Sequence, residues 1–176
     1  MDSRWERGSE GEKQQTILLM NIARLITQSG RSKAEFLSDQ ALLRGALMVG
    51  VCETWLNQGI MDTEVLHNFP GYSLFRGDRQ VRQGGGVALY LQDHLSGDLL
   101  ASFDNSVCQA IAVMVHQINT CVVVCYRPPD THAAEFSDML DSLDSVLATL
   151  PTPTPNIVLM GDFNCRDQLF SSVAKE

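Results

Sequence analysis

The sequence has no long apolar run and no segment with the composition of a secretory signal. None of its hydrophobic stretches approaches the ~20 residues that a helix needs to cross a bilayer. Residues 1–16 are polar and charged, which does not fit a signal peptide. These features predict a protein that is not secreted, does not cross a membrane and works inside the cell, in the nucleus or the cytoplasm.

The sequence also lacks cysteine pairs at metal-binding spacing. It has 5 cysteines, an odd number, and none of them forms a Cys-x-x-Cys pair. Cys121 and Cys125 can share one face of a strand, but four residues of strand rise, about 13 Å, is too far for a disulfide. None of the 4 histidines lies at ligand spacing from a cysteine pair. We therefore expect neither a disulfide partner nor a zinc site.

Positive charge is scarce. The formal net charge is -8, which disfavours strong nonspecific binding to nucleic acid, because such binding neutralises phosphates with Lys and Arg. It does not exclude a nuclease, since a cleft that binds a metal ion is itself acidic. The exception is a local cluster, in which Arg76, Arg79 and Arg82 come just before three consecutive glycines.

The length of 176 residues and the 44% hydrophobic content predict one folded domain. We expect a disordered polar leader at residues 1–15 and one domain over 16–176, without internal repeats. A capping box at Ser32 and Glu35 predicts a helix start. Apolar periodicity and turn residues predict further strands and helices. The expected strands are 17–21, 47–52, 72–76, 86–91, 107–116, 120–126 and 156–160, and the first two expected helices are 33–45 and 62–68. A third helix is expected after a cap at Asp130 or Thr131, with apolar positions from Phe136 to Leu150.

Polar side chains follow several of the expected strands, at the point where each strand ends. They are Asn21, Glu53, Tyr126, Asp162 and Asn164. Taken singly, each is explained as well by a strand terminus or a turn as by a function. If the strand ends gather at one edge, the acids and amides suit a hard cation such as Mg²⁺, which prefers oxygen ligands.

The order of these residues and their neighbours resembles that of a known superfamily. The motifs, in chain order, are Asn21, Glu53-Thr54-Trp55-Leu56, Arg76-Gly77-Asp78-Arg79, Gly84-Gly85-Gly86-Val87-Ala88-Leu89-Tyr90, Tyr126-Arg127-Pro128-Pro129 and Gly161-Asp162-Phe163-Asn164. This order is similar to that of the endonuclease/exonuclease/phosphatase superfamily. More narrowly, it resembles the apurinic-type endonuclease domain of non-LTR retrotransposons, over about residues 16–166.

The resemblance implies an α/β fold, a four-layer sandwich of two mixed sheets flanked by helices (DNase I-like). It also implies hydrolysis of DNA phosphodiesters with Mg²⁺ (or Mn²⁺) as cofactor, and a full-length relative that is fused to a reverse transcriptase. Glu53 would hold the metal, and Asn21 would orient the substrate or a metal-bound water. Asp162 would activate the attacking water, while Asn164 would hold Asp162 or the scissile phosphate.

The resemblance also implies substrate contacts. Tyr126 would bond to a phosphate oxygen during catalysis. Arg76, Arg79 and Arg127 would contact the nucleic-acid backbone, because the forked donors of arginine suit phosphate. For the arginines at the hairpin tip, a purely solvated role has about equal weight.

The sequence departs from the family pattern in two places. Relatives carry an Asn-x-Arg-Ser type segment after the first strand, whereas Arg24 comes one place late here. Relatives also continue beyond the last motif to a Ser-Asp-His segment whose His-Asp pair serves catalysis, and only residues 165–176 follow Asn164 here. We therefore expect a domain that is incomplete at the C-terminus and impaired in cleavage. The alternatives are an inactive nuclease-fold binding module, a non-functional fragment, or a phosphatase of the same superfamily.

Overall fold

The computed structural model describes six stretches of the chain. They are residues 16–26, 33–79, 84–105, 107–129, 135–150 and 155–164. The expected leader at residues 1–15, the helix cap at Ser32 and the third clustered arginine, Arg82, lie outside the described residues.

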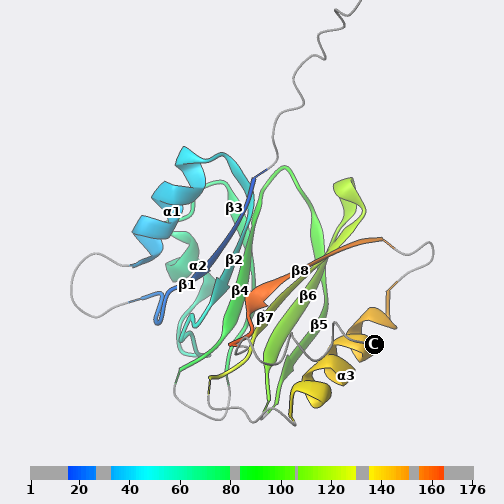
Figure 1. Ribbon diagram of the computed structural model, residues 1–176. Helices are drawn as coiled ribbons and strands as arrows, with labels where there is room; N and C mark the ends of the chain where they lie inside the picture. The colour runs from blue at the N-terminus through cyan, green and yellow to red at the C-terminus, as the bar shows by residue number, and fades with distance from the viewer. Residues whose placement is uncertain are drawn as a thin grey trace, which may run out of the picture.

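Two four-stranded sheets pack face to face, with helices on the outer side of each sheet (Figure 1). Helices α1 and α2 cover one sheet, and helix α3 covers the other, which gives the four layers and the mixed α/β sandwich that the resemblance implies. The first sheet has the order β1-β2-β4-β3 and the second has the order β5-β6-β7-β8. The elements are β1 Thr16–Asn21, α1 Lys33–Leu43, β2 Ala46–Cys52, α2 Asp62–Leu66, β3 Tyr72–Gly77, β4 Val87–Gln92, β5 Gly97–Asp104, β6 Gln109–Val115, η1 His116–Ile118, β7 Thr120–Tyr126, α3 Glu135–Leu147 and β8 Asn156–Asp162.

Each sheet contains one parallel pair, and these pairs position the candidate site. Strands β1 and β2 run parallel, so that Asn21 is paired with Cys52, one residue before Glu53. Strands β7 and β8 also run parallel, so that Tyr126 is paired with Asp162. The carboxyl ends of both pairs therefore carry the polar residues that the sequence singled out.

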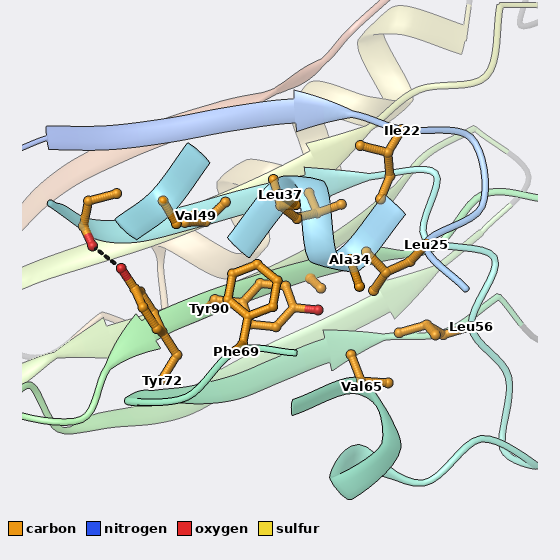
Figure 2. Packing of buried hydrophobic residues seen from close by; sticks show 14 residues of the cluster. Ile22, Leu25, Ala34, Leu37, Val49, Leu56, Val65, Phe69, Tyr72 and Tyr90 are labelled. Atoms are coloured by element: carbon orange, nitrogen blue, oxygen red, sulfur yellow. Dashed lines mark hydrogen bonds between the residues drawn. The ribbon is translucent and has the colours of Figure 1, made fainter. Parts of the chain in front are cut away.

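The core behind the first sheet is rich in aromatic rings (Figure 2). Phe69 stacks on Tyr90 at 3.9 Å between ring centroids, and it meets Tyr72 edge-on at 5.7 Å. The Tyr72 hydroxyl donates a 2.6 Å hydrogen bond to the backbone carbonyl of Ala46, which satisfies the polar end of a ring that is otherwise buried. Leu37 on α1 completes this layer and is fully buried.

The strands in the middle of the sandwich are buried along their whole length. Every residue of β6 and β7 is buried, as are all residues of β2 except Leu47. Near-continuous apolar sequences fit this position, because both faces of these strands are covered. One cluster fills the space between the sheets, and a further cluster lies between the second sheet and α3.

The expected strands and helices are confirmed. Most of their described ends lie within one or two residues of the expected ends. One strand was missed: β5, at the edge of the second sheet, has exposed and partly buried residues that give no clean alternation. The acidic side of α3 is solvated as expected, since Asp138, Asp141 and Asp144 are exposed. Within the described stretches, no helix has the length and the apolar character needed to cross a membrane.

Candidate active site

The side chain of Asn21 joins the two sheets at one edge of the sandwich. Its amide nitrogen donates a 2.9 Å hydrogen bond to Glu53 Oε1 and a 2.6 Å hydrogen bond to Asp162 Oδ2. A primary amide has two N–H groups, so both donors of Asn21 are engaged. Two carboxylates from different sheets are thus held within reach of one nitrogen atom.

Backbone hydrogen bonds connect the turn that carries Glu53 to the glycine-rich segment before β4. The Thr54 N–H donates to Gly86 O at 3.2 Å, and the Trp55 N–H donates to Gly85 O at 2.8 Å. Glu53 and Trp55 have φ values of 58° and 56°, in the left-handed region that non-glycine residues rarely adopt. Such conformations persist only where the surroundings hold them, and they concentrate at functional sites.

The glycines opposite this turn are required by close contacts. A Cβ on Gly86 would lie 2.4 Å from Thr54 Oγ1, and its φ of +84° also disfavours a side chain. A Cβ on Gly85 would lie 2.3 Å from Oε1 of the buried Gln109. The same Gln109 oxygen accepts a 2.8 Å hydrogen bond from the Gly86 N–H. Gln109 therefore fixes the glycine segment from beneath, a role that the sequence did not reveal.

The end of β8 is fixed by reciprocal contacts with the end of β7. The Asn164 amide donates a 2.7 Å hydrogen bond to Arg127 O, and the Asn164 N–H donates to Asp162 Oδ1 at 3.2 Å. Arg127 Nη1 donates to the carbonyls of Phe163 and Asn164 at 3.3 and 3.1 Å. Gly161 permits this approach, since a Cβ there would lie 1.8 Å from Cys125 O. Asn164 thus contacts Asp162 through its backbone N–H, and its side chain bonds to the end of β7; the two expected roles of its side chain stay predictions.

Tyr126 and Cys52 stand beside the two carboxylates and remain protonated. Burial, together with the charge and hydrogen bond of Glu53, raises the pKa of Tyr126 to about 12, and Asp162 adds to this. Burial, together with the charges of Asp162 and Glu53, raises the pKa of Cys52 to about 12. Tyr126 is therefore a hydrogen-bond donor to Glu53 at neutral pH, and Cys52 is a buried thiol that donates to Cys125 O.

Arg79 belongs to the same group of residues. Its Cδ and Nη1 atoms lie 3.0 and 3.1 Å from the position that a Cβ on Gly85 would occupy. Its positive charge lowers the pKa of Tyr126, opposing the carboxylates. The structure therefore brings Arg79 together with Asn21, Glu53, Tyr126, Asp162 and Asn164, all of them predicted from the sequence.

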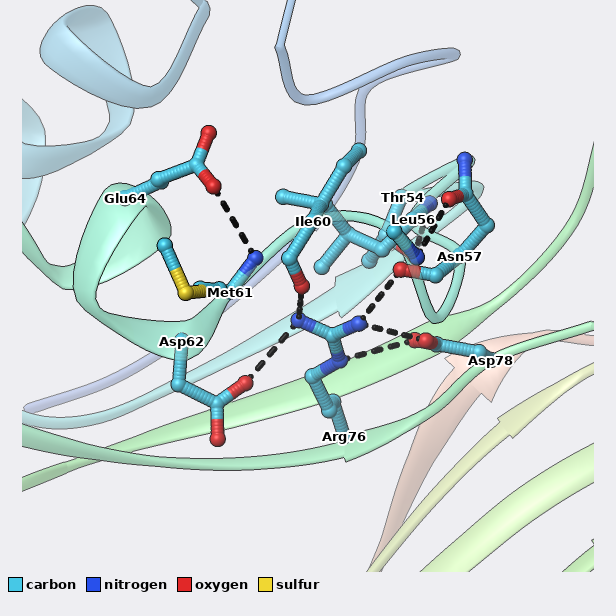
Figure 3. Close-up of polar contacts among 10 residues, drawn as sticks. Thr54, Leu56, Asn57, Ile60, Met61, Asp62, Glu64, Arg76 and Asp78 are labelled. Atoms are coloured by element: carbon cyan, nitrogen blue, oxygen red, sulfur yellow. Dashed lines mark hydrogen bonds and ion pairs between the residues drawn. The ribbon is translucent and has the colours of Figure 1, made fainter.

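Arg76 lies elsewhere and is fully engaged with the protein (Figure 3). Its guanidinium bonds to both carboxylate oxygens of Asp78, to Asp62 at 2.9 Å, and to the carbonyls of Asn57 and Ile60 at 2.8 and 2.9 Å. Arginine has five N–H donors, and each of them has a partner here. Its side chain is only 13% exposed, so Arg76 anchors the segment before α2 to β3 in this structure, with no donor left over for the expected phosphate contact.

Arg127 also has other partners than the nucleic-acid backbone expected from the resemblance. The residue is 2% exposed, and its guanidinium bonds to the backbone of the segment after β8. In this structure it positions the segment that contains Asp162 and Asn164 from inside the protein. A contact between its side chain and a substrate phosphate stays a prediction.

The donor set fits a magnesium ion. Within the described stretches, no group of three or more His, Cys, Asp and Glu side chains is placed to hold a metal. Mg²⁺ binds to one or two carboxylates and takes its remaining ligands from water and substrate phosphates. Glu53 and Asp162, which share the Asn21 amide, match that requirement. They do not match zinc, which takes three or four protein ligands rich in nitrogen and sulfur.

Comparison with known proteins shows a partial family match and several solved structures of similar fold. The model of the family described as "Endonuclease-reverse transcriptase" matches residues 120–176. None of the curated proteins matches the chain. Among solved structures, the endonuclease domain of TRAS1, a telomere-specific non-LTR retrotransposon, is similar at a TM-score of 0.58 and 16% identity, over 90% of this chain and 70% of that one.

Two further structures show how widely the fold is shared. Humanized TDP2 of D. rerio has a TM-score of 0.56 and 17% identity, over 89% of this chain and 65% of that one. The mannosyl-6-phosphatase Bt3783 of Bacteroides thetaiotaomicron has a TM-score of 0.62 and 12% identity, over 92% of this chain and 70% of that one. The chain thus spans 65% to 70% of the length of these three structures.

The fold and the family match agree with the resemblance seen in the sequence. The chain shares the two-sheet α/β fold of these structures, and its sequence motifs resemble those of the endonuclease/exonuclease/phosphatase superfamily. The match over residues 120–176 adds a likeness to endonucleases linked to reverse transcriptases.

Proposed function

We propose that this chain carries out Mg²⁺-dependent hydrolysis of DNA phosphodiesters, as part of a retrotransposon-type endonuclease linked to a reverse transcriptase. The observation that carries the proposal is the Asn21 amide, which joins Glu53 and Asp162 from the two sheets. The likeness to the TRAS1 endonuclease domain and to the endonuclease-reverse transcriptase family favours DNA as substrate.

Glu53 would hold the cation, and Asp162 would take the proton of the attacking water. Asp162 is suited to this role because Asn21 and the Asn164 N–H fix both of its carboxylate oxygens. A bound Mg²⁺ ion would neutralise the charge that develops on the phosphoryl oxygens. Tyr126 and Arg79 would supply a neutral and a charged donor to phosphate oxygens at the same edge, as expected from the resemblance.

The turnover expected of this chain is low. The described histidines are His67, His94 and His116, and the last two lie at the opposite end of the strands from Glu53. His94 follows β4, which starts opposite Cys52 and runs away from it. His116 precedes β7, whose other end carries Tyr126. Catalytic residues that act as a unit lose most of the rate when one member is lacking.

Plasmid nicking tests the proposal. We expect slow Mg²⁺-dependent nicking that is lost in Glu53→Gln and in Asp162→Asn, each of which removes one charge at nearly constant shape. Asp98→Asn is the matched control, because Asp98 is exposed and pairs with His116 at the other end of the second sheet. Equal nicking by all four proteins would contradict the assignment of the site.

The alternatives give different results in the same experiment. A folded chain that binds DNA and Mn²⁺ but never nicks would be an inactive nuclease-fold binding module. Hydrolysis of a small phosphomonoester, lost in Asp162→Asn and without any nicking, would indicate a phosphatase. A chain that binds neither DNA nor metal would be a non-functional fragment.

A further inference from the structure

The guanidinium of Arg24 lies on an aromatic ring beside the candidate active site. Its Cζ atom is 4.8 Å from the centroid of the Trp55 ring, within the range of a cation–π contact. Trp55 follows Glu53 by two residues, and its N–H is bonded to Gly85. The ring is therefore fixed to the same segment as the carboxylate that is proposed to hold the metal.

The backbone of Arg24 is anchored to the site directly. Its N–H donates a 2.7 Å hydrogen bond to Glu53 O, and the next N–H, of Leu25, donates to Thr54 O at 2.8 Å. Ala23 and Arg24 have φ values of 40° and 79°, two successive left-handed residues without glycine. Lys33 from α1 donates to the carbonyls of Ile22 and Ala23 and so stabilises this bend.

Because the site edge carries two carboxylates, a phosphate can bind there only if a positive charge is available. Glu53 and Asp162 repel a phosphate, and the guanidinium of Arg127 at this edge donates to protein acceptors. Within the stretches that the structure describes, the Arg24 guanidinium forms no hydrogen bond or ion pair, and its side chain is partly exposed. Its N–H groups are thus available while the guanidinium is held over the Trp55 ring.

We propose that Arg24, held on the Trp55 ring, binds a backbone phosphate of duplex DNA next to the phosphate that is cut. The proposal rests on the function proposed above, because it places DNA at the same edge. A guanidinium that stacks through its face keeps the donors on its rim for a bidentate phosphate contact. Trp55 fixes the fork in advance, so little rotamer freedom is lost on binding.

Binding is measured without cleavage, in the Asp162→Asn background, by fluorescence anisotropy of a labelled DNA duplex over a range of salt concentrations. We expect Arg24→Ala to bind about tenfold more weakly, as for loss of a charged hydrogen bond. The slope of log affinity against log salt should shrink by about 0.9, the value for one phosphate on duplex DNA. Arg44→Ala is the control, since Arg44 is exposed and precedes the far end of β2.

Two further variants address the geometry. Trp55→Leu should weaken binding about threefold and leave the salt slope unchanged, because the charge remains but its support is lost. Arg24→Lys should do the same, because an ammonium neutralises a phosphate but lacks the planar fork. If Arg24→Ala fails to fold, as judged by circular dichroism, the Arg24→Lys result decides, and unchanged affinity in that variant overturns the proposal.

The outcomes separate this inference from the proposed hydrolysis. If Arg24→Ala matches Arg44→Ala in affinity and slope, Arg24 does not bind phosphate, whether or not the parent chain nicks DNA. If the parent chain never nicks DNA but Arg24→Ala loses affinity and slope, the inference stands and the proposed hydrolysis fails. Nicking by the parent chain together with the expected Arg24 effects supports both.

Discussion

The core behind the first sheet and the site edge of the sandwich are built on different principles. The core consists of regular strands and helices around buried rings such as Phe69 and Tyr90. The site edge is made of short turns held by polar contacts between segments far apart in the sequence. Among the described residues other than glycine, six have positive φ, and five of these flank the site: Ala23, Arg24, Glu53, Trp55 and Asn164.

This difference shows which part of the molecule supplies stability. Left-handed conformations of residues other than glycine cost about 1–3 kcal/mol each, so the site edge cannot fold on its own account. It is held because Asn21, Glu53, Tyr126 and Asp162 lie at or beside the ends of paired strands, and one strand of each pair, β2 or β7, is buried. Changes in the core should therefore affect stability most, and changes at the site should affect function with little loss of stability.

The largest effect is expected for Phe69→Ala. Phe69 is 1% exposed and contacts both Tyr90 and Tyr72, so the change leaves a cavity that this rigid layer cannot fill (Figure 2). We expect the free energy of unfolding to fall by about 3–5 kcal/mol. Urea denaturation followed by circular dichroism measures it. A loss below about 1 kcal/mol would show that this core is not the main source of stability.

A smaller but substantial effect is expected for Arg76→Ala. The change leaves Asp78, whose side chain is 10% exposed, without its partner and frees the carbonyls of Asn57 and Ile60. Removing one partner of a largely buried ion pair leaves an uncompensated charge, so we expect a loss of about 2–4 kcal/mol. Arg44→Ala, at an exposed position, should change stability by less than about 0.5 kcal/mol.

The Arg76 variant also tests the role that the sequence suggested. For Arg76→Ala and Arg44→Ala, the free energy of unfolding from urea denaturation is compared with the DNA affinity at one salt concentration. Lower stability with DNA affinity like that of Arg44→Ala supports the anchoring role seen in the structure. Unchanged stability together with weaker DNA binding would instead support the expected contact between Arg76 and a phosphate.

Much of the fold could be predicted because its signals are local. Continuous apolar runs gave β2, β6 and β7, and the periodicity of α3 gave its position and its acidic outer side, although α3 ends at Leu147, three residues before Leu150. Strand β5 could not be predicted, since an edge strand with mixed exposure has no strict alternation to detect. Residues at strand ends were predictable for the same reason as the strands, and five of them gather as expected.

The arginines could not be assigned from the sequence, because several of their partners lie far along the chain. Asp62 is 14 residues before Arg76, and Asn164 is 37 residues after Arg127. Arg24 seemed misplaced by one residue relative to the family pattern. Two successive left-handed residues, which the sequence does not suggest, bring it onto Trp55. The single available signal was a pair, an arginine and a tryptophan that each closely follow a predicted site residue.

At the site, Glu53→Gln should raise the free energy of unfolding, whereas the core variants lower it. Without a cation, the carboxylates of Glu53 and Asp162 repel each other across the Asn21 amide. Removing one charge while keeping an acceptor for Asn21 should stabilise the fold by up to about 1 kcal/mol, and Mg²⁺ should no longer raise the melting temperature. Thermal melts with and without Mg²⁺ measure both effects. A destabilised Glu53→Gln protein would mean that the site supports the fold rather than being supported by it.

The smallest effect is the dependence of stability on alkaline pH. The folded protein raises the pKa of Tyr126 to about 12, from an ordinary value of 10, chiefly by burial and then through Glu53. Between these values the unfolded chain releases the proton and the folded chain keeps it. This contribution to stability is therefore complete below pH 10 and is lost as the pH rises toward 12.

Tyr126→Phe isolates this contribution, because it keeps the ring and removes the titrating group. Between pH 10 and 12 the free energy of unfolding of this variant should fall less steeply with pH than that of the parent protein. The difference between the two slopes should correspond to the release of up to about one proton on unfolding. Glu53→Gln should lower the pKa of Tyr126 toward its ordinary value, which the ultraviolet absorbance of the phenolate would show. The pKa of Tyr90 in the core is raised chiefly by burial, without a contribution from Glu53, and should stay unchanged. If both tyrosines shifted together, the site edge and the core would not be independent, because one substitution at the edge would then have loosened both.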